Sequence, residues 1–242
     1  MTNSRLALVY LLVIVGVIVV ASYGGFRDFL PILVGGTLVT IKITVMSALV
    51  AVPCAIVAAL AKVYGALPLR WLATAYIEFF RGTSALVQLF WLFFVLPYFG
   101  ITLEPVTAAV LGLGLNLGAY GAEVVRGAVQ AVPRGQWEAS TALNMTRAMA
   151  LRRIVLPQAF VAMIPPWGNL FIELLKATAI VSFITINDLT FRAKGIADIT
   201  LRTADAYNVA LVIYLCIALA ITFGMRSLER WAARGLARGR SA

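Results

Sequence analysis

Residues 206–225, AYNVALVIYLCIALAITFGM, form a run without a charged side chain, bounded by Asp205 and Arg226. A helix needs about 20 such residues to cross the hydrocarbon core of a bilayer. The chain contains five further windows of this kind, at residues 6–26, 43–61, 82–103, 105–122 and 154–172. None of them alternates strictly between apolar and polar residues, as the strands of a membrane β-barrel do. The windows therefore predict an all-α integral membrane protein with six spans.

Composition agrees with this fold class, because 62% of the 242 residues are hydrophobic and only 12% are charged. A soluble domain of this length is closer to half apolar and a quarter charged. Histidine is absent from the chain. Its absence excludes Ser–His and Cys–His catalysis, HExxH zinc chemistry and a histidine proton relay. No GxxxxGK[ST] motif occurs, so we expect no nucleotide site in this chain.

The net charge of +10 reflects membrane topology rather than nucleic-acid binding. If residue 1 is cytoplasmic and the windows alternate, most basic residues fall in the inner segments 1–5, 62–75, 126–153 and 226–242. This is the positive-inside bias, and it predicts that both termini are cytoplasmic. Residues 6–22 favour a retained anchor helix, with a cleaved signal peptide as the alternative. At the other end, the arginines at positions 226, 230, 234 and 238 favour anchoring to anionic headgroups.

The windows and their flanking residues also predict the individual elements. We expect a Gly-rich connection at residues 22–36, and then helices over about 37–63, 71–96, 105–128 and 206–225. A further helix should start near Ile154 and be interrupted by Pro165-Pro166 and Gly168. Cys54 and Cys216 lie within apolar windows and are expected to be packing residues.

The longest hydrophilic inner segment is residues 133–157, PRGQWEASTALNMTRAMALRRIVLP. Residues 136–143 are expected to be helical because strong helix formers lie at their centre. Asn144 suits the left-handed conformation that ends a helix, and Thr146 suits the N-cap of the next one. The segment thus predicts a helix, a sharp turn and a second helix that project from the membrane. An ordinary inner loop is the alternative.

Within this segment, Glu138-Ala139-Ser140, Asn144 and Ile154-Val155-Leu156-Pro157 resemble the EAA loop of binding-protein-dependent ABC importer permeases. That loop reads Glu-Ala-Ala, three residues, Gly, and later Ile-x-Leu-Pro. This chain departs from it at Ser140 and Asn144. The resemblance implies that the loop docks on an ATPase subunit through the residues Gly135, Glu138, Ala139, Ser140, Leu143, Asn144, Leu156 and Pro157.

Further motifs resemble the polar amino-acid uptake subfamily. Residues 77–88, IEFFRGTSALVQ, are similar to its IExxRGTPxxVQ signature, and residues 116–127, NLGAYGAEVVRG, to its NxxAYxxExxRG segment. The pairs Pro157-Gln158 and Pro165-Pro166, with the later Asn169, also match. The signature residues Glu78, Arg81, Gly82, Thr83 and Gln88 are expected to be structural, with Glu78 and Arg81 pairing on one helix face.

This resemblance implies five core transmembrane helices of the ABC importer permease type plus one N-terminal transmembrane helix. It divides the chain into an anchor helix and outer linker at 1–34, the transmembrane domain at 35–231 and a basic cytoplasmic tail at 232–242. It also implies a bacterial cytoplasmic (inner) membrane location, no covalent chemistry and no cofactor on this chain, with ATP-Mg on the partner ATPase subunit. The other implied partners are a second permease chain, identical or related, an extracytoplasmic solute-binding protein and membrane lipid.

The implied function is ATP-driven import of a polar amino acid or a related small zwitterion. Residues 90–97, FWLFFVLP, and 167–176, WGNLFIELLK, most resemble permeases for ectoine and hydroxyectoine. The stretch Lys176-Ala177-Thr178-Ala179 replaces Lys-Asp-Thr-Ser of other members, which argues against a cationic amino-acid site. The alternative function is an ATP-independent channel or secondary carrier for small solutes.

Polar residues inside a span are costly, so they are either functional or internally paired. One stripe with helical spacing lies at 116, 120 and 123, and another at 169, 173 and 176. We expect a translocation pathway lined by Asn116, Tyr120, Glu123, Trp167, Asn169, Glu173, Lys176 and Thr178. Helix packing is the alternative for both stripes. For a zwitterion, Glu173 and Lys176 would supply charges, and Trp167 with Phe171 an aromatic or apolar wall.

Overall fold

The computed structural model describes residue 16 and residues 25–238, with side chains to residue 234. The expected anchor span at 6–22 therefore lies outside the described residues, apart from residue 16. The described elements are helical throughout, and they are α2 (Gly25–Tyr64), α3 (Leu67–Gly82), α4 (Ala85–Phe90), the π-helix η1 (Trp91–Val95), the 3₁₀-helix η2 (Leu96–Phe99), α5 (Pro105–Gln130), α6 (Arg134–Ala142), α7 (Arg147–Ala150), the π-helix η3 (Leu151–Val155), α8 (Leu156–Ala177), the 3₁₀-helix η4 (Thr178–Ile184), α9 (Leu189–Thr200) and α10 (Thr203–Arg238).

Four helical segments of the described part are long and apolar enough to cross a membrane, at Phe26–Tyr64, Pro105–Gln130, Arg147–Ile184 and Thr203–Arg234. A fifth span is possible if α3 and the helices of residues 85–99 cross together, although these two parts meet at an angle of 104°. The described residues thus account for four or five of the six expected spans. An all-helical membrane protein is confirmed.

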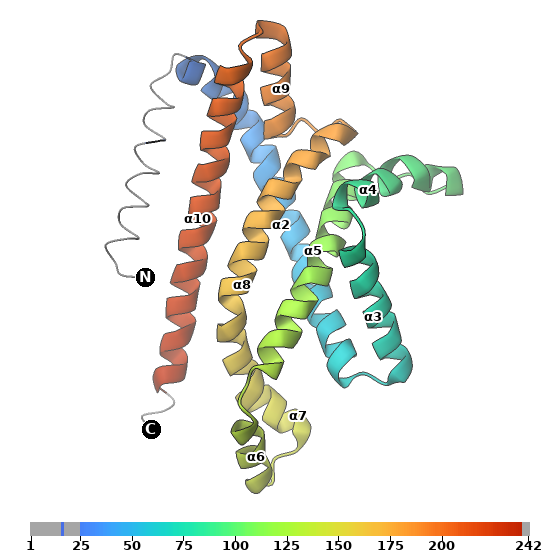
Figure 1. Ribbon diagram of the computed structural model, residues 1–242, viewed down its shortest axis with the longest axis vertical. Coiled ribbons are helices and arrows are strands. Elements are labelled where there is room, and N and C mark those ends of the chain that lie inside the picture. Colours follow the sequence, from blue (N-terminus) through green and yellow to red (C-terminus); the bar gives the residue numbers. More distant parts are fainter. Residues whose placement is uncertain (1–15, 17–24, 239–242) are drawn as a thin grey trace.

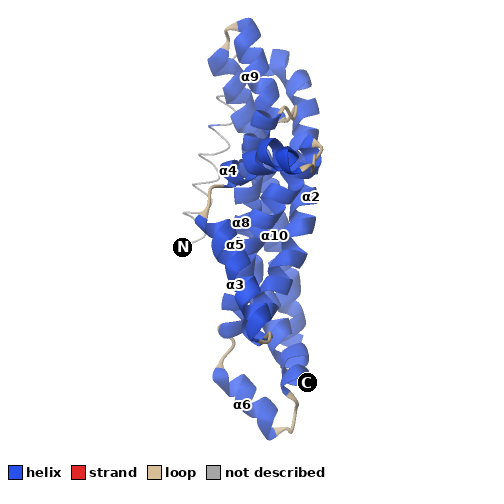
Figure 2. Ribbon diagram, turned by 90° about the vertical axis from the view of Figure 1, so that its right-hand side faces the viewer, coloured by secondary structure: helices blue, strands red, loops and turns tan. Residues whose placement is uncertain are grey.

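The long helices α2, α5, α8 and α10 run along one another and give the molecule its elongated shape (Figure 1). The helices α6 and α7 project from one end of this bundle, and α9 lies at the opposite end in both views (Figures 1 and 2). The short helix α3 lies beside α5, and the chain then turns sharply into α4, which also packs on α5 (Figure 1). The hydrophilic inner segment and the connection between α8 and α10 are therefore separated by the full length of the bundle.

The contact between α2 and α5 is the most extensive helix–helix contact in the described chain. The two helices approach each other closely because glycines of α5 lie at the contact. A Cβ atom at Gly114 would lie 2.9 Å from Val50, and one at Gly118 would lie 3.2 Å from the carbonyl of Ala51. Small residues of this kind let helix backbones approach each other in membranes. The buried residues Ile43, Ala51, Ala55, Leu113 and Leu117 fill the same contact.

The outer end of the bundle has a second apolar cluster, made where α2, α9 and α10 meet. Phe29 and Leu33 of α2 pack there with Leu189 and Ala193 of α9 and Val209 of α10. This packing explains why the expected Gly-rich connection at 22–36 is wrong from residue 25 onward. Residues 25–36 continue α2, and the glycines serve close packing: a Cβ at Gly36 would lie 2.8 Å from the carbonyl oxygen of Asp188.

Two further expectations about helix continuity are wrong. The helix expected at 71–96 bends sharply after Gly82, whereas α8 runs unbroken through Pro165 and Pro166. Both prolines are exposed, while Trp167 and Leu170 are buried. The packed face of α8 therefore keeps its backbone helical where the prolines remove two amide donors. At the chain's other end, α10 extends from Thr203 to Arg238, beyond the expected 206–225.

Asp188 fixes the start of α9. Its carboxylate accepts the backbone N–H of Phe191 at 2.9 Å and that of Thr190 at 3.2 Å, and its side chain is fully buried. Burial raises the pKa of this carboxyl group. The hydrogen bonds from the two backbone N–H groups lower the pKa, but burial has the larger effect. The next residue, Leu189, donates its N–H to Thr40 Oγ1 at 3.1 Å. The cap thus joins α9 to the middle of α2.

We expect Asp188→Ala to lower the free energy of unfolding by about 1–2 kcal/mol, because the variant loses both N-cap acceptors. The midpoint of thermal unfolding of the detergent-purified protein should fall by a few degrees. Asp188→Asn keeps one acceptor oxygen in place and should cost less than the alanine variant. Equal midpoints for wild type and Asp188→Ala would contradict this role.

Candidate coupling and translocation sites

The inner knob, residues 134–155, has the predicted helix–turn–helix form. Its first helix, α6, spans Arg134–Ala142, close to the expected 136–143. Asn144 has a φ of 54°, in the left-handed region, and reverses the chain. Thr146 then caps α7 by accepting the N–H of Met149 at 3.3 Å. The local structure of this segment is thus set by residue types that can be recognised in the sequence.

One face of α6 anchors the knob to the bundle. Trp137 packs against a buried cluster that includes Val132 of the preceding connection and Val155 of η3. Ser140 is 1% exposed, and its hydroxyl donates to the carbonyl of Gln136 at 2.6 Å. The Trp137 contact packs α6 against the inner ends of α5 and α8.

The other face of α6 is open. Gly135, Glu138 and Ala139 are exposed, and Leu143 exposes 71% of its surface. Leu143 and Glu138 thus offer an apolar group and a charged group for contact with another protein. Among the other expected coupling residues, Ser140 faces inward, Asn144 makes the turn, and Pro157 is exposed in the first turn of α8. Leu156 is half-buried.

A side-chain clamp closes the bend between α3 and α4. Asn116 of α5 donates to the carbonyl of Phe80 at 2.9 Å and to Gln88 Oε1 at 3.1 Å. Gln88 donates to the same Phe80 carbonyl at 3.0 Å and to the Thr83 hydroxyl. The bend leaves carbonyl groups without their usual helical donors, and these side chains supply the missing donors. The motif residues at 77–88 and 116–127 therefore meet in space.

Tyr120 belongs to the same contact. Its hydroxyl donates to the carbonyl of Arg81 at 3.4 Å, and the Arg81 guanidinium carbon lies 5.5 Å from the centre of its ring. The expected pairing of Glu78 with Arg81 is wrong, because no salt bridge joins them in the described part of the chain. Arg81 instead rests on the aromatic face of Tyr120, a cation–π contact.

Glu123 is neutralised by two cations near the inner ends of α2 and α5. Lys62 Nζ lies 2.8 Å from one carboxylate oxygen, and Arg126 lies 2.6 Å from the other. Sequence reasoning missed Lys62 as a partner, although its position at the boundary of a charge-free window is a usable signal. The whole stripe of Asn116, Tyr120 and Glu123 is thus engaged in contacts within this chain.

The stripe on α8 differs, because Asn169, Glu173 and Lys176 are all exposed on one face of the helix. No salt bridge of the described residues involves Glu173 or Lys176. A carboxylate and an ammonium group on a membrane-spanning helix are too costly to face lipid tails. This face is therefore expected to meet water or protein.

The expected aromatic wall does not join that stripe. Trp167 is only 6% exposed and lies in the core, where its ring would contact any Cβ placed at Gly121 of α5. The Phe171 ring lies 5.3 Å from that of Trp167. Thr178 is fully buried and donates to the carbonyl of Leu175 at 2.7 Å. Trp167 and Thr178 are therefore packing residues and do not share the exposed face of Glu173 and Lys176.

Comparison with known proteins finds transport-system membrane proteins in each case. The family model described as "Binding-protein-dependent transport system inner membrane component" matches residues 51–238. The chain is 45% identical over 216 residues to a probable amino-acid ABC transporter permease protein, y4tF, of Sinorhizobium fredii, covering 85% of this chain and 91% of that protein. It is 39% identical to the L-cystine transport system permease protein TcyB of Bacillus subtilis, covering 84% of this chain and 88% of that protein.

A solved structure extends the likeness to three dimensions. The crystal structure of an amino acid ABC transporter with histidines matches with a TM-score of 0.79 and 37% sequence identity. The match covers 84% of this chain and 95% of the solved chain.

We expect Asn116→Leu to destabilise the protein by about 1–3 kcal/mol, since the bend loses a half-buried donor. The thermal midpoint in detergent should fall by about 2–4 °C per kcal/mol. Asn208→Leu, at an exposed position of α10, is the matched control and should melt like wild type. If both variants melt alike, Asn116 does not hold the bend.

Proposed function

Because the chain belongs to the family of binding-protein-dependent transport system inner membrane components, we propose that it is the permease subunit of an ATP-driven importer for a polar amino acid or a related small zwitterion. Membership makes the chain a multi-pass inner membrane component that is not itself an ATPase. ATP and its magnesium ion belong to the partner ATPase subunit, and both ends of this chain lie in the cytoplasm.

The observation that supports ATP coupling is the form of the inner knob. Trp137 packs the knob against the bundle, while Glu138 and Leu143 are exposed. A projecting helix with an exposed leucine and a carboxylate fits a cleft on a second protein. In this proposal Gly135, Glu138, Ala139 and Leu143 contact the ATPase subunit, and the movement that follows ATP binding reaches α8 through the knob.

The translocation pathway runs along the exposed face of α8. Asn169, Glu173 and Lys176 line it, and a second permease chain, identical or related, covers it. A polar face toward a partner avoids the cost of charges in lipid. A small zwitterion needs an anionic and a cationic contact, which Glu173 and Lys176 provide. Asn116, Tyr120 and Glu123 support the pathway indirectly, since their polar groups already hold the α3–α4 bend and the inner ends of α2 and α5.

The relatives narrow the substrate class. One is named for L-cystine and another, from Escherichia coli, for glutamine, and this supports a polar amino acid. Ectoine and hydroxyectoine, to which residues 90–97 and 167–176 point by resemblance, belong in the same test because they are zwitterions of similar size. Uptake of labelled amino acids and of both ectoines by proteoliposomes, with the binding protein supplied, discriminates among these substrates.

We expect Glu138→Arg combined with Leu143→Arg to abolish copurification of the ATPase subunit, because the changes reverse the charge and remove the apolar contact of the exposed face. The measurement is mass spectrometry of tagged chain purified gently from its host. The control is Ala233→Arg, which adds the same side chain at an exposed position of α10. If no ATPase subunit copurifies with the wild-type chain, the importer function is wrong and the protein is an ATP-independent channel or carrier.

We expect Glu173→Gln combined with Lys176→Met to reduce both uptake and substrate-stimulated ATP hydrolysis by about tenfold or more, since each lost charge contact is worth at least about 1.4 kcal/mol. ATPase copurification should be retained. Lys194→Met, at an exposed lysine of α9 outside the candidate spans, is the control and should transport normally. Unchanged uptake and unchanged stimulation of ATP hydrolysis in the double variant would show that the pathway does not run along this face.

A further inference from the structure

The inner knob joins α8 through the π-helix η3, residues Leu151–Val155. The backbone N–H of Leu156 donates to the carbonyl of Leu151, five residues earlier, where an α-helix would use the carbonyl four residues earlier. A single π-turn inserts one extra residue into a helix, and such turns are frequent at functional sites. The helical segment that enters the membrane from the knob therefore has a wide, irregular turn where the knob meets the bundle.

The sequence around η3 occurs a second time in the chain. The π-helix η1 (Trp91–Val95) also ends at a Val-Leu-Pro triplet, at residues 95–97, as η3 does at residues 155–157. Proline has no N–H, and in a regular helix its ring collides with the carbonyl four residues earlier. After Pro97 the helix ends at Gly100, whereas after Pro157 it continues to Ala177. The turn at η3 is thus an interruption within a continuing helix.

Proline alone does not account for η3, because Pro165 and Pro166 lie within α8 without a π-turn. Burial on both sides distinguishes this turn. Ala150 is 3% exposed and Val155 is fully buried, and the two are five residues apart. Residues five apart lie on the same side of a π-turn, as residues four apart do in an α-helix. The π-turn therefore keeps both side chains buried with one additional residue between them.

Gln158 bridges this turn and the knob. Its Nε2 donates to the carbonyl of Ile154 in η3 at 3.0 Å and to Gln136 Oε1 of α6 at 3.4 Å. The first bond supports the widened turn from the side chain. The second is longer than the usual range of about 2.7–3.2 Å, so it can be broken at little cost. Gln158 is thus placed to hold the knob at its present angle to α8 and to release it.

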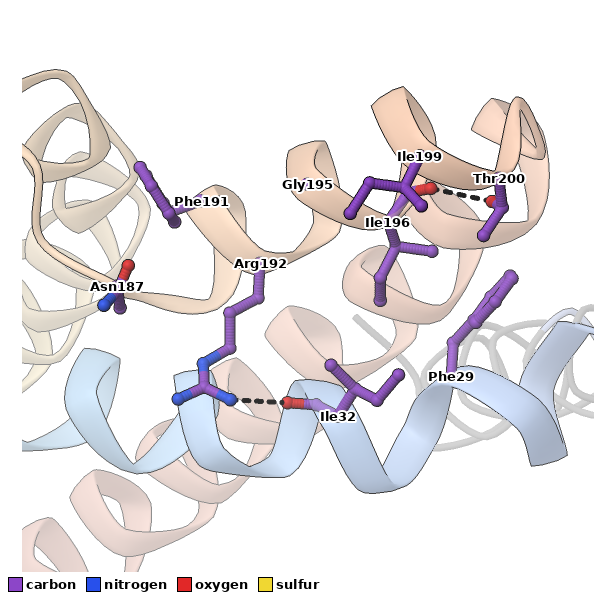
Figure 3. A pocket seen from close by; sticks show the side chains of 9 residues that line it. All are labelled: Phe29, Ile32, Asn187, Phe191, Arg192, Gly195, Ile196, Ile199 and Thr200. Carbon is purple, nitrogen blue, oxygen red and sulfur yellow. Dashed lines mark hydrogen bonds between the residues drawn. The ribbon is translucent and has the colours of Figure 1, made fainter.

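The outer end of α8 is held more firmly than the inner end. There η4 leads into α9, whose first residue, Leu189, is fully buried and donates its N–H to Thr40 of α2 at 3.1 Å. One turn later, Arg192 donates from Nη1 to the carbonyl of Ile32 of α2 at 3.1 Å (Figure 3). Hinges are a few residues at element ends that absorb a change in backbone angles. A movement of the knob relative to the bundle is therefore taken up at η3.

We infer that η3 is a hinge on which the inner knob pivots relative to α8, and that Gln158 is the positioning residue that sets its resting angle through Gln136. A pivot that exceeds the slack of the hinge is passed on to α8. This inference rests on the proposed function, because the pivot has a role only if the knob docks on an ATPase subunit.

The first test measures the pivot in the complete transporter, reconstituted in nanodiscs. Spin labels are attached to Ala148→Cys of α7 and Ala162→Cys of α8, both at exposed positions, in a chain whose two native cysteines are replaced by alanine. Double electron–electron resonance gives the distance between the labels with and without ATP. We expect ATP to change this distance by more than about 1.5 Å, the rise of one helical residue.

The second test removes the hinge by deleting Arg152, an exposed residue of η3. Ala150 and Val155 are then four residues apart, so both stay buried in a regular helix. We expect this variant to retain the ATPase subunit and its thermal midpoint. Its label distance should not respond to ATP, and its solute-stimulated ATP hydrolysis should fall about tenfold.

Two controls accompany the deletion. Arg152→Ala removes the charge but keeps the residue count, and it should be stimulated like wild type. Deletion of Phe160, which is also exposed but lies in the regular part of α8, rotates the following helix by about 100° and should lower the thermal midpoint. An Arg152 deletion that melts as early as the Phe160 deletion would overturn the assignment of η3 as an inserted turn.

A third test addresses Gln158 without altering the chain length. Gln158→Met keeps the size of the side chain and removes its donor, so the resting angle of the knob is lost. We expect the ratio of solute-stimulated to basal ATP hydrolysis to fall about threefold or more, with an unchanged thermal midpoint. Gln136→Met should have the same effect, and the double variant no larger one, because both changes remove one contact.

The outcomes separate the hinge from the importer function. A label distance that ATP leaves unchanged, in a wild type whose ATP hydrolysis is stimulated by solute, would overturn the hinge and leave the importer intact. Normal stimulation in the Arg152 deletion would have the same meaning, and an unaltered ratio in both glutamine variants would remove Gln158 from its positioning role. A wild type that copurifies with no ATPase subunit would instead contradict the proposed function.

Discussion

Inside a bilayer every backbone amide and carbonyl must find its partner within the protein, and the bend between α3 and α4 is where this chain depends on side chains to meet that demand. The carbonyl of Phe80 receives both Asn116 and Gln88, and Tyr120 reaches the carbonyl of Arg81. These donors come largely from α5, which is also the helix packed most closely on α2. The position of α5 therefore determines where α3 ends and where α4 begins.

This dependence explains what the sequence could and could not predict. The charge-free windows identify the spans because a charged side chain is costly inside a bilayer, whichever helix it packs against. The turn at Asn144 and the cap at Thr146 were predictable because both act within a few residues. The bend after Gly82 was not, since two of the donors that permit it, Asn116 and Tyr120 of α5, are 36 and 39 residues from their acceptors. The continuity of α8 through Pro165-Pro166 was missed for the same reason, because packing of its buried face outweighs the local signal.

The two polar stripes show the limit of helical spacing as evidence. Asn116, Tyr120 and Glu123 repeat at the same intervals as Asn169, Glu173 and Lys176, so that both stripes suggested a pathway. The folded chain distinguishes them: the first stripe makes contacts with α2, α3 and α4, whereas the second is exposed and forms no salt bridge with any residue that the structure describes. Only the tertiary structure can distinguish a polar group that stabilises the fold from one left for a solute.

The exposed stripe acquires its meaning from what lies at the two ends of α8. At the inner end, Gln158 donates to Gln136 of α6 at 3.4 Å, and Val155 packs with Trp137, so the knob is packed against the start of α8. At the outer end, α8 passes through η4 to α9, which presents Arg192. A helix transmits displacement along its axis because its hydrogen bonds resist stretching. In the proposed mechanism, a shift of the inner knob on ATP binding would therefore be passed along α8 to the exposed Asn169, Glu173 and Lys176, and this is how one helix could link ATP binding to solute passage.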